Sequence, residues 1–117
     1  MESKNQFTDE FILGTIAKGK QYILLLYKEG PNRNQSPEET KSLQMAHLRH
    51  LFSLRAEGKL LLNGPVTDES GLSGIGIFSL TDIKEVAALV SQDPSVKAGR
   101  LLFELYPMFA LPGDKLI

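Results

Sequence analysis

His47 is the residue of this sequence best placed for acid–base chemistry. It lies in the middle of the apolar arc of a predicted helix, together with Leu43, Leu51 and Leu54. A histidine on the inner face of a helix can gain and lose a proton near neutral pH and so act as a general acid or base. The alternative is a core histidine whose ring is hydrogen-bonded to a backbone carbonyl. The residue pattern alone leaves both interpretations open.

Asp93 is the candidate partner of His47. An aspartate bonded to one ring nitrogen of a histidine fixes the tautomer of the ring and stabilises the imidazolium. Aspartate before proline is also a frequent turn initiator, and Asp93 directly precedes Pro94. The catalytic interpretation therefore requires a fold that brings Asp93 next to His47.

The sequence offers little for a metal or a bound cofactor. His50 follows His47 by three residues, a spacing at which two histidines could share a metal ion, but no third ligand stands out. We interpret His50 as a partly exposed surface histidine. Cysteine is absent, and the glycines at 71, 74 and 76 precede a strand rather than the helix of a dinucleotide-binding loop. We expect neither a metal site nor a cofactor.

Asn63, Gly64, Pro65 and Arg100 are candidates for the lining of a pocket. The Gly-Pro pair should end or distort the pairing of a predicted strand, and strand irregularities often lie beside active sites. Arg100 could bind an anionic substrate, although a solvated charge at the edge of the sheet is the simpler interpretation. We place the pocket between the sheet and the helices, near Gly64 and Pro65.

The elements that must position these residues follow the order strand, helix, strand, strand, helix, strand. From the apolar patterns we expect strands at residues 22–27, 60–66, 75–80 and 100–106, and helices at residues 37–57 and 82–93. Ser36, Pro37 and Glu39 form a capping box that starts the first of these helices. Gly58 is suited to the left-handed position just after its end.

This order of elements predicts a ferredoxin-like βαββαβ fold of the α+β class, with two helices on one face of a four-stranded antiparallel sheet. The leucine-rich strands look apolar on both sheet faces, so a monomer would expose an apolar face. Pairing of two copies through that face, as a homodimer, covers it. We assign residues 1–19 to an N-terminal extension with a short helix that docks on the domain or on a partner chain, or else frays. Residues 20–110 form the domain and 111–117 a tail.

Composition limits the partners and the location that we expect. The chain has 117 residues, of which 42% are hydrophobic and 23% charged, and its formal net charge is -1. This charge gives no basic face for nucleic-acid phosphates, so we expect no nucleic-acid partner. No apolar stretch is long enough for a membrane span, and the N-terminus lacks the basic region of a signal peptide. We therefore expect a soluble, cytoplasmic protein without a membrane partner.

A set of short segments is spread over most of the chain, from about Tyr22 to Phe109. The segments are His47-Leu48, Gly58-Lys59-Leu60-Leu61-Leu62-Asn63-Gly64-Pro65, Gly71, Gly74, Asp93-Pro94, Ala98-Gly99 and Glu104-Leu105-Tyr106-Pro107. In this order and at these spacings, the set resembles the YCII-related family. The resemblance implies a ferredoxin-like subunit that pairs into a dimeric α+β barrel. It also implies a cleft with a histidine and an aspartate, which correspond here to His47 and Asp93.

The resemblance also implies a class of chemistry. The fold is related to that of small lyases, isomerases and monooxygenases such as muconolactone isomerase-like proteins. The few assigned activities of the family suggest acid–base chemistry on small cyclic or aromatic compounds, without a metal. The chain departs from the family pattern at Ser95, where a bulky residue often follows Asp-Pro, and in a longer loop at residues 30–35 and a longer extension before Lys20. These departures could reshape the cleft.

Two functional hypotheses follow. In the first, the chain is a cofactor-free lyase or isomerase in which His47 transfers a proton and Asp93 orients it. The substrate is then a small cyclic or aromatic compound. In the alternative, the chain is a non-catalytic dimeric module that binds a small ligand or another protein, and His47 has a structural role.

Overall fold

The computed structural model of the chain describes residues 6–117, and its strands and helices follow the predicted order. The strands are β1 (Lys20–Glu29), β2 (Leu60–Pro65), β3 (Leu72–Phe78) and β4 (Leu101–Ala110). The helices are α1 (Asp9–Ile16), α2 (Pro37–Ala56), α3 (Ile83–Ser91) and α4 (Pro94–Lys97). The part of the predicted extension at residues 1–5 lies outside the described residues.

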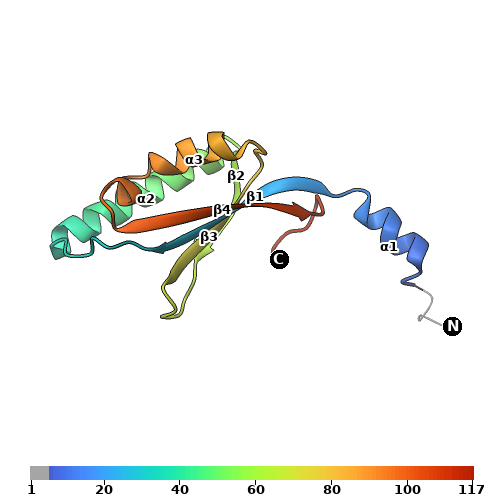
Figure 1. The fold of residues 1–117 in the computed structure, drawn as a ribbon, viewed down its shortest axis with the longest axis horizontal. Coiled ribbons are helices and arrows are strands. Elements are labelled where there is room, and N and C mark those ends of the chain that lie inside the picture. Colours follow the sequence, from blue (N-terminus) through green and yellow to red (C-terminus); the bar gives the residue numbers. More distant parts are fainter. Residues whose placement is uncertain (1–5) are drawn as a thin grey trace.

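The strands form one antiparallel sheet in the order β2-β3-β1-β4, so the first strand of the domain lies in the middle. Helices α2 and α3 lie side by side over one face of this sheet (Figure 1). This arrangement is the predicted ferredoxin-like fold, because the two βαβ halves interleave their strands and place both helices on the same face.

The alternation of β1 decides which of its side chains reach the helices. Ile23, Leu25 and Tyr27 are buried and face α2 and α3, whereas Leu24 and Leu26 point to the opposite sheet face and are only half-buried. The buried set forms the hydrophobic core with side chains from both helices and two other strands: Leu51, Leu54, Leu60, Phe78, Val86 and Val90.

Helix α2 begins with the capping box that the sequence predicts. The hydroxyl of Ser36 accepts a hydrogen bond from the amide of Glu39 at 3.1 Å, and the Glu39 carboxylate accepts one from the Ser36 amide at 2.9 Å. The helix ends at Ala56, and Gly58 follows with a φ of 74°, which only glycine adopts readily. His47 is thereby held in the middle of a long helix.

Several boundaries differ from the predicted ones. β3 begins three residues earlier, and β4 continues to Ala110, because it stays paired with the whole of β1. The register shift in β2 lies between Leu60 and Leu62, whereas Gly64 and Pro65 remain paired with β3 before the strand ends. An edge strand tolerates a proline there, because the backbone amide that proline lacks would point away from the sheet and is not needed for pairing. The short helix α4 was not predicted, because Asp93-Pro94 was interpreted as the end of the preceding helix and as a turn initiator.

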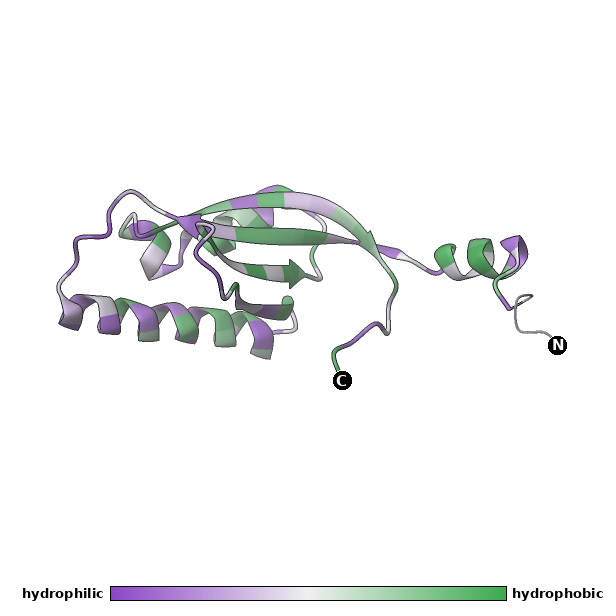
Figure 2. Ribbon diagram, turned by 90° about the horizontal axis from the view of Figure 1, so that it is seen from below, coloured by the Kyte–Doolittle hydropathy of each residue, from purple (hydrophilic) through white to green (hydrophobic). Residues whose placement is uncertain are grey.

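The second face of the sheet carries no helix. Half-buried apolar side chains line it, and Leu102 and Tyr106 of β4 are exposed there. Helix α1 has no buried residue, and it lies beyond the end of β1, away from the other helices (Figures 1 and 2). Figure 2 shows hydrophobic residues along α1, and the large ones among them are exposed. The division into extension, domain and tail stays a prediction.

Candidate functional site

The fold brings His47 and Asp93 into direct contact, although 46 residues separate them in the sequence. His47 comes from the middle of α2, and Asp93 caps the N-terminus of α4. Nδ1 of His47 lies 2.6 Å from Oδ2 of Asp93. The proximity that the acid–base hypothesis requires is therefore present, whereas the catalytic role of the pair stays a prediction.

Asp93 is fully buried, with 0% of its surface exposed, and both oxygens of its carboxylate have hydrogen-bond partners. The hydroxyl of Tyr27 donates to Oδ2 at 2.8 Å, and the amide of Ser95 donates to Oδ1 at 2.9 Å. Burial on its own would raise the pKa of Asp93. The hydrogen bond and charge of His47, together with the bonds from Ser95 and Tyr27, outweigh burial and hold that pKa below its usual range.

The ionised state of Asp93 decides the tautomer of His47. A carboxylate can only accept hydrogen bonds, so Nδ1 of the histidine must carry a proton and donate it. In the neutral ring, Nε2 then holds the free lone pair. Among residues 6–117 no side chain or backbone group is hydrogen-bonded to Nε2, and the His47 ring lines a pocket. Such a nitrogen can take a proton from a bound molecule.

Tyr27 completes the group and was not predicted to do so. Its ring packs edge-on against that of His47, with the ring centres 5.3 Å apart and the planes at 72°. Tyr27 is paired with Gly74 of the neighbouring strand β3. Burial, followed by the charge and the hydrogen bond of Asp93, raises the pKa of Tyr27 far above its usual value. Tyr27 therefore stays protonated and acts as a hydrogen-bond donor.

Asp93 serves as a turn initiator and as the partner of His47 at the same time. Its Oδ1 accepts the amide of the second residue of α4, while Pro94 occupies the first helical position, where no amide is needed. Its Oδ2 is thus left for His47 and Tyr27. The cap of α4 and the contact with His47 therefore use different oxygens of the same carboxylate.

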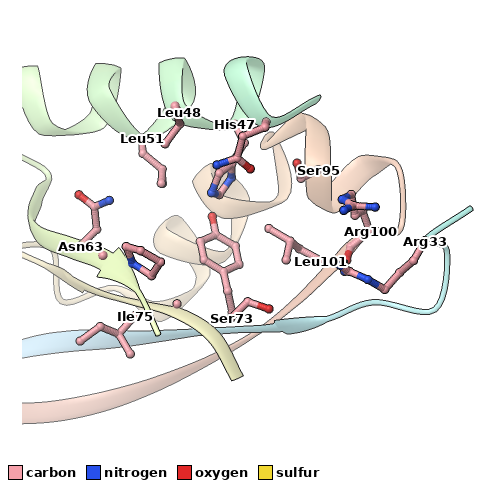
Figure 3. Close-up of a pocket in the computed structure, with 15 residues that line it drawn as sticks. Arg33, His47, Leu48, Leu51, Asn63, Ser73, Ile75, Ser95, Arg100 and Leu101 are labelled. Atoms are coloured by element: carbon pink, nitrogen blue, oxygen red, sulfur yellow. Dashed lines mark hydrogen bonds between the residues drawn. The ribbon is translucent and has the colours of Figure 1, made fainter. Parts of the chain in front are cut away.

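His47 lies in the wall of a pocket of about 300 Å³ between α2 and the sheet (Figure 3). The four residues that the sequence proposed as lining all contribute to it: Asn63, Gly64, Pro65 and Arg100. Leu48, Leu51 and Leu101 supply apolar surface, and Ser95 lies beside the histidine. Arg33, from the loop before α2, also lines the pocket and was not singled out from the sequence. A pocket of this size fits a small ring compound.

His50 has a different environment from that of His47. Its Nε2 lies 2.9 Å from the carbonyl oxygen of Leu89, so the ring joins α2 to α3. It is half-buried and does not line the pocket. Within residues 6–117, no group of three His, Asp or Glu side chains is arranged to hold a metal ion.

Residues 21–111 match the YCII-related domain, which covers most of the chain. The search of curated proteins gave no significant match. In the part of the chain that the structure describes, no helix has the length and apolar character needed to cross a membrane.

The solved structures that are similar to this chain include two enzymes. One is 5-chloro-2-hydroxyhydroquinone dehydrochlorinase (TftG) from Burkholderia phenoliruptrix in complex with 2,5-dihydroxybenzoquinone. It is 26% identical, with a TM-score of 0.52, and the match covers 72% of this chain and 90% of that one. The other is muconolactone isomerase, which is 11% identical with a TM-score of 0.62, over 80% of this chain and 93% of that one. At that identity the second match supports the fold alone.

Proposed function

The chain belongs to the YCII-related family, and from this premise we propose that it is a lyase or isomerase acting on small cyclic or aromatic compounds. One observation carries the proposal. A histidine in the wall of a pocket is held at 2.6 Å by a fully buried aspartate whose pKa is lowered. A buried, ionised carboxylate behind a histidine is a common arrangement for general acid–base catalysis.

In the proposed mechanism, Nε2 of His47 removes a proton from a carbon or hydroxyl of the bound ring. Asp93 keeps the ring in the required tautomer and stabilises the imidazolium that forms. In an isomerase, the electron pair shifts along the ring system and the imidazolium returns the proton to another carbon. In a lyase, the electron pair left by the removed proton forms a double bond and expels a leaving group as an anion. The imidazolium then passes its proton to that anion or to water. Both routes balance without a further reactant.

The dehydrochlorinase guides the choice of substrates to test, because its match covers 72% of this chain at 26% identity. As its name states, that enzyme acts on a chlorinated, hydroxylated ring. Hydroxylated and chlorinated hydroquinones are therefore the first compounds to test as lyase substrates, and unsaturated lactones with a ring-carbon proton are the isomerase counterparts.

We also propose that two copies of the chain pair through the sheet face that carries no helix. That face presents half-buried side chains from β1, β2 and β3 and the exposed Leu102 and Tyr106 of β4. Lys28 and Glu104 form an ion pair on the same face, which is otherwise mostly apolar. A largely apolar open face is characteristic of an interface, and a two-fold axis lets one patch meet its own copy.

The test of the catalytic proposal compares turnover by the wild type with that of His47→Gln and Asp93→Asn on these two groups of compounds. We expect at least one compound to release chloride or to exchange a ring proton in heavy water. Each variant should reduce kcat by about a hundredfold or more, the usual contribution of a positioned general base. Asp93→Asn should also change the ring-nitrogen chemical shifts of His47, since an amide can donate to Nδ1 and reverse the tautomer.

His50→Gln is the matched control, because it removes a histidine one turn along the same helix that does not line the pocket. Its kcat should stay within about twofold of the wild type, as expected for a change outside the reacting groups. Full turnover by His47→Gln would exclude the mechanism. Binding of these compounds without any turnover by the wild type would favour the non-catalytic binding module.

A further inference from the structure

We propose that Arg33 and Arg100 form a subsite for the carboxylate of the ligand, so that the pocket takes a small cyclic acid. This inference rests on the proposed function of the His47 pocket and narrows its substrate class. Arg33 and Arg100 lie together at one end of the pocket, while Asn63 and Ile75 lie at the other end and His47 lies above the middle (Figure 3).

The charges that line the pocket are all basic. Arg33 and Arg100 line it, together with His47, and none of its lining residues is an aspartate or a glutamate. Asp93 lies behind the histidine, where it is fully buried and hydrogen-bonded to three donors. The Asp93 carboxylate contacts the His47 ring and does not line the pocket. A ligand in this pocket therefore meets a positive potential, which favours an anion.

Neither arginine has its charge neutralised. Arg33 donates from one Nη to the carbonyl oxygen of Arg100 at 2.7 Å, and Arg100 donates from one Nη to the side-chain oxygen of Gln35 at 2.9 Å. Both acceptors are uncharged. Among the ion pairs of residues 6–117, none involves either arginine. Because a guanidinium has five N–H donors, each keeps several for a ligand, in the flat fork that fits a carboxylate.

The backbone that carries the two arginines is held in place before any ligand binds. The loop that carries Arg33 is bonded to the start of β4 through its backbone. The Gly30 amide donates to the Arg100 carbonyl at 2.8 Å, and the Asn32 amide donates to the Gly99 carbonyl at 3.0 Å. Gly30 is required for this approach, since a Cβ there would lie 2.3 Å from the Gly99 oxygen. An acid group that binds here loses little energy to ordering the protein.

The position of the subsite has a consequence for the reaction. An acid group held by Arg33 and Arg100 would direct its ring along the pocket, over Leu48 and Leu101 and past His47. The arginines do not exchange protons with the ring. They act as positioning residues that hold one end of the substrate while the histidine acts on another.

Binding of benzoate and benzamide tests the subsite, because the two have nearly the same shape and differ by one charge. We expect amide signals of residues 95–101 to shift with benzoate in a nuclear magnetic resonance titration, and benzamide to bind at least about tenfold more weakly. Arg100→Gln and Arg33→Gln should each weaken benzoate about tenfold or more, the usual effect of losing a charged hydrogen bond, and leave benzamide unchanged. Arg33→Lys, which keeps the charge, should recover part of the affinity.

Arg49→Gln is the matched control, since it removes one positive charge from an exposed position of α2 outside the pocket. Its benzoate affinity should stay within about twofold, because exposed charges at a distance are screened. All titrations are repeated with His47→Gln, so that binding is measured independently of turnover. The proposal is overturned if benzoate and benzamide bind alike, if Arg49→Gln weakens benzoate as much as Arg100→Gln, or if inorganic phosphate displaces benzoate at equal concentration.

Discussion

At the scale of single residues, the side chain of Asp93 connects three parts of the molecule. One carboxylate oxygen caps α4, and the other accepts from Tyr27 of β1 and lies 2.6 Å from Nδ1 of His47 of α2. Each donor lowers the free energy of the charged form, and together they outweigh the cost of burying a charge. Removing any one of these donors therefore makes the charged form of the Asp93 carboxylate, which orients the histidine, less stable.

Tyr27→Phe tests this arrangement through its pH dependence. The wild-type tyrosine has a pKa raised above the ordinary value of 10.0, so the folded protein keeps a proton that the unfolded chain releases. The stability that Tyr27 contributes is fully present below pH 10 and is lost as the pH rises further, by up to about 1.4 kcal/mol per pH unit. We expect Tyr27→Phe to lose about 1.5–3 kcal/mol at pH 7, from the missing bond to a charged acceptor.

Above pH 10 the difference in stability between the wild type and Tyr27→Phe should shrink, because only the wild type has this group to ionise. Urea unfolding at several pH values between 7 and 11 measures it. Tyr22→Phe is the control, since Tyr22 lies on the same strand but its hydroxyl makes no hydrogen bond within the described chain. A constant difference between Tyr27→Phe and the wild type across this range would show that the hydroxyl does not have a raised pKa.

At the scale of elements, the sequence predicted best where local signals agree. Ser36, Pro37 and Glu39 mark the start of α2, and the strands of the sheet are apolar runs. The helix α4 was missed because one helical turn after a proline has no periodicity to detect. Tyr27 was missed as a partner of Asp93 for a related reason. Alternation along β1 predicts which face the ring occupies, but not which residue 66 positions later meets it.

The sequence predicted part of the candidate site. Family resemblance paired His47 with Asp93, and the pocket near Gly64 and Pro65 followed from the strand irregularity, although the register shift itself lies at Leu60–Leu62. Arg33 lay in a loop whose composition carries no signal for the direction of a side chain. Its position depends on bonds to the start of β4, which only the tertiary structure defines.

Ser36→Ala tests the contribution of the capping box that positions α2. The substitution removes the acceptor for the Glu39 amide, and we expect a loss of about 1 kcal/mol in the free energy of unfolding. Urea denaturation at pH 7 measures it. Ser53→Ala, at an exposed position inside the same helix, should be neutral or slightly stabilising, since alanine is the better helix former. Equal losses in the two variants would rule out a specific role of the cap.

At the scale of the whole molecule, helices cover one face of the sheet, and the other face is open and mostly apolar apart from the Lys28–Glu104 ion pair. Helix α1 also exposes apolar surface, because Phe11 and Leu13 are exposed and no residue of the helix is buried. A monomer would thus leave two apolar surfaces in water, the open sheet face and α1. Both are adjacent to β1 and β4, so a second copy could cover the two together.

Leu102→Asp tests the pairing of two copies. Leu102 is 52% exposed on the open sheet face, opposite Lys28 on β1, so the variant should fold while placing a charge in the proposed interface. We expect the wild type to sediment with twice the chain mass of 12.9 kDa, and the variant to dissociate at least about tenfold more readily, because moving a charged side chain from water into an interface is costly. Phe52→Asp is the control, since Phe52 is 63% exposed on α2, away from that face. A wild type that sediments as a monomer, or equal dissociation of both variants, would exclude pairing through this face.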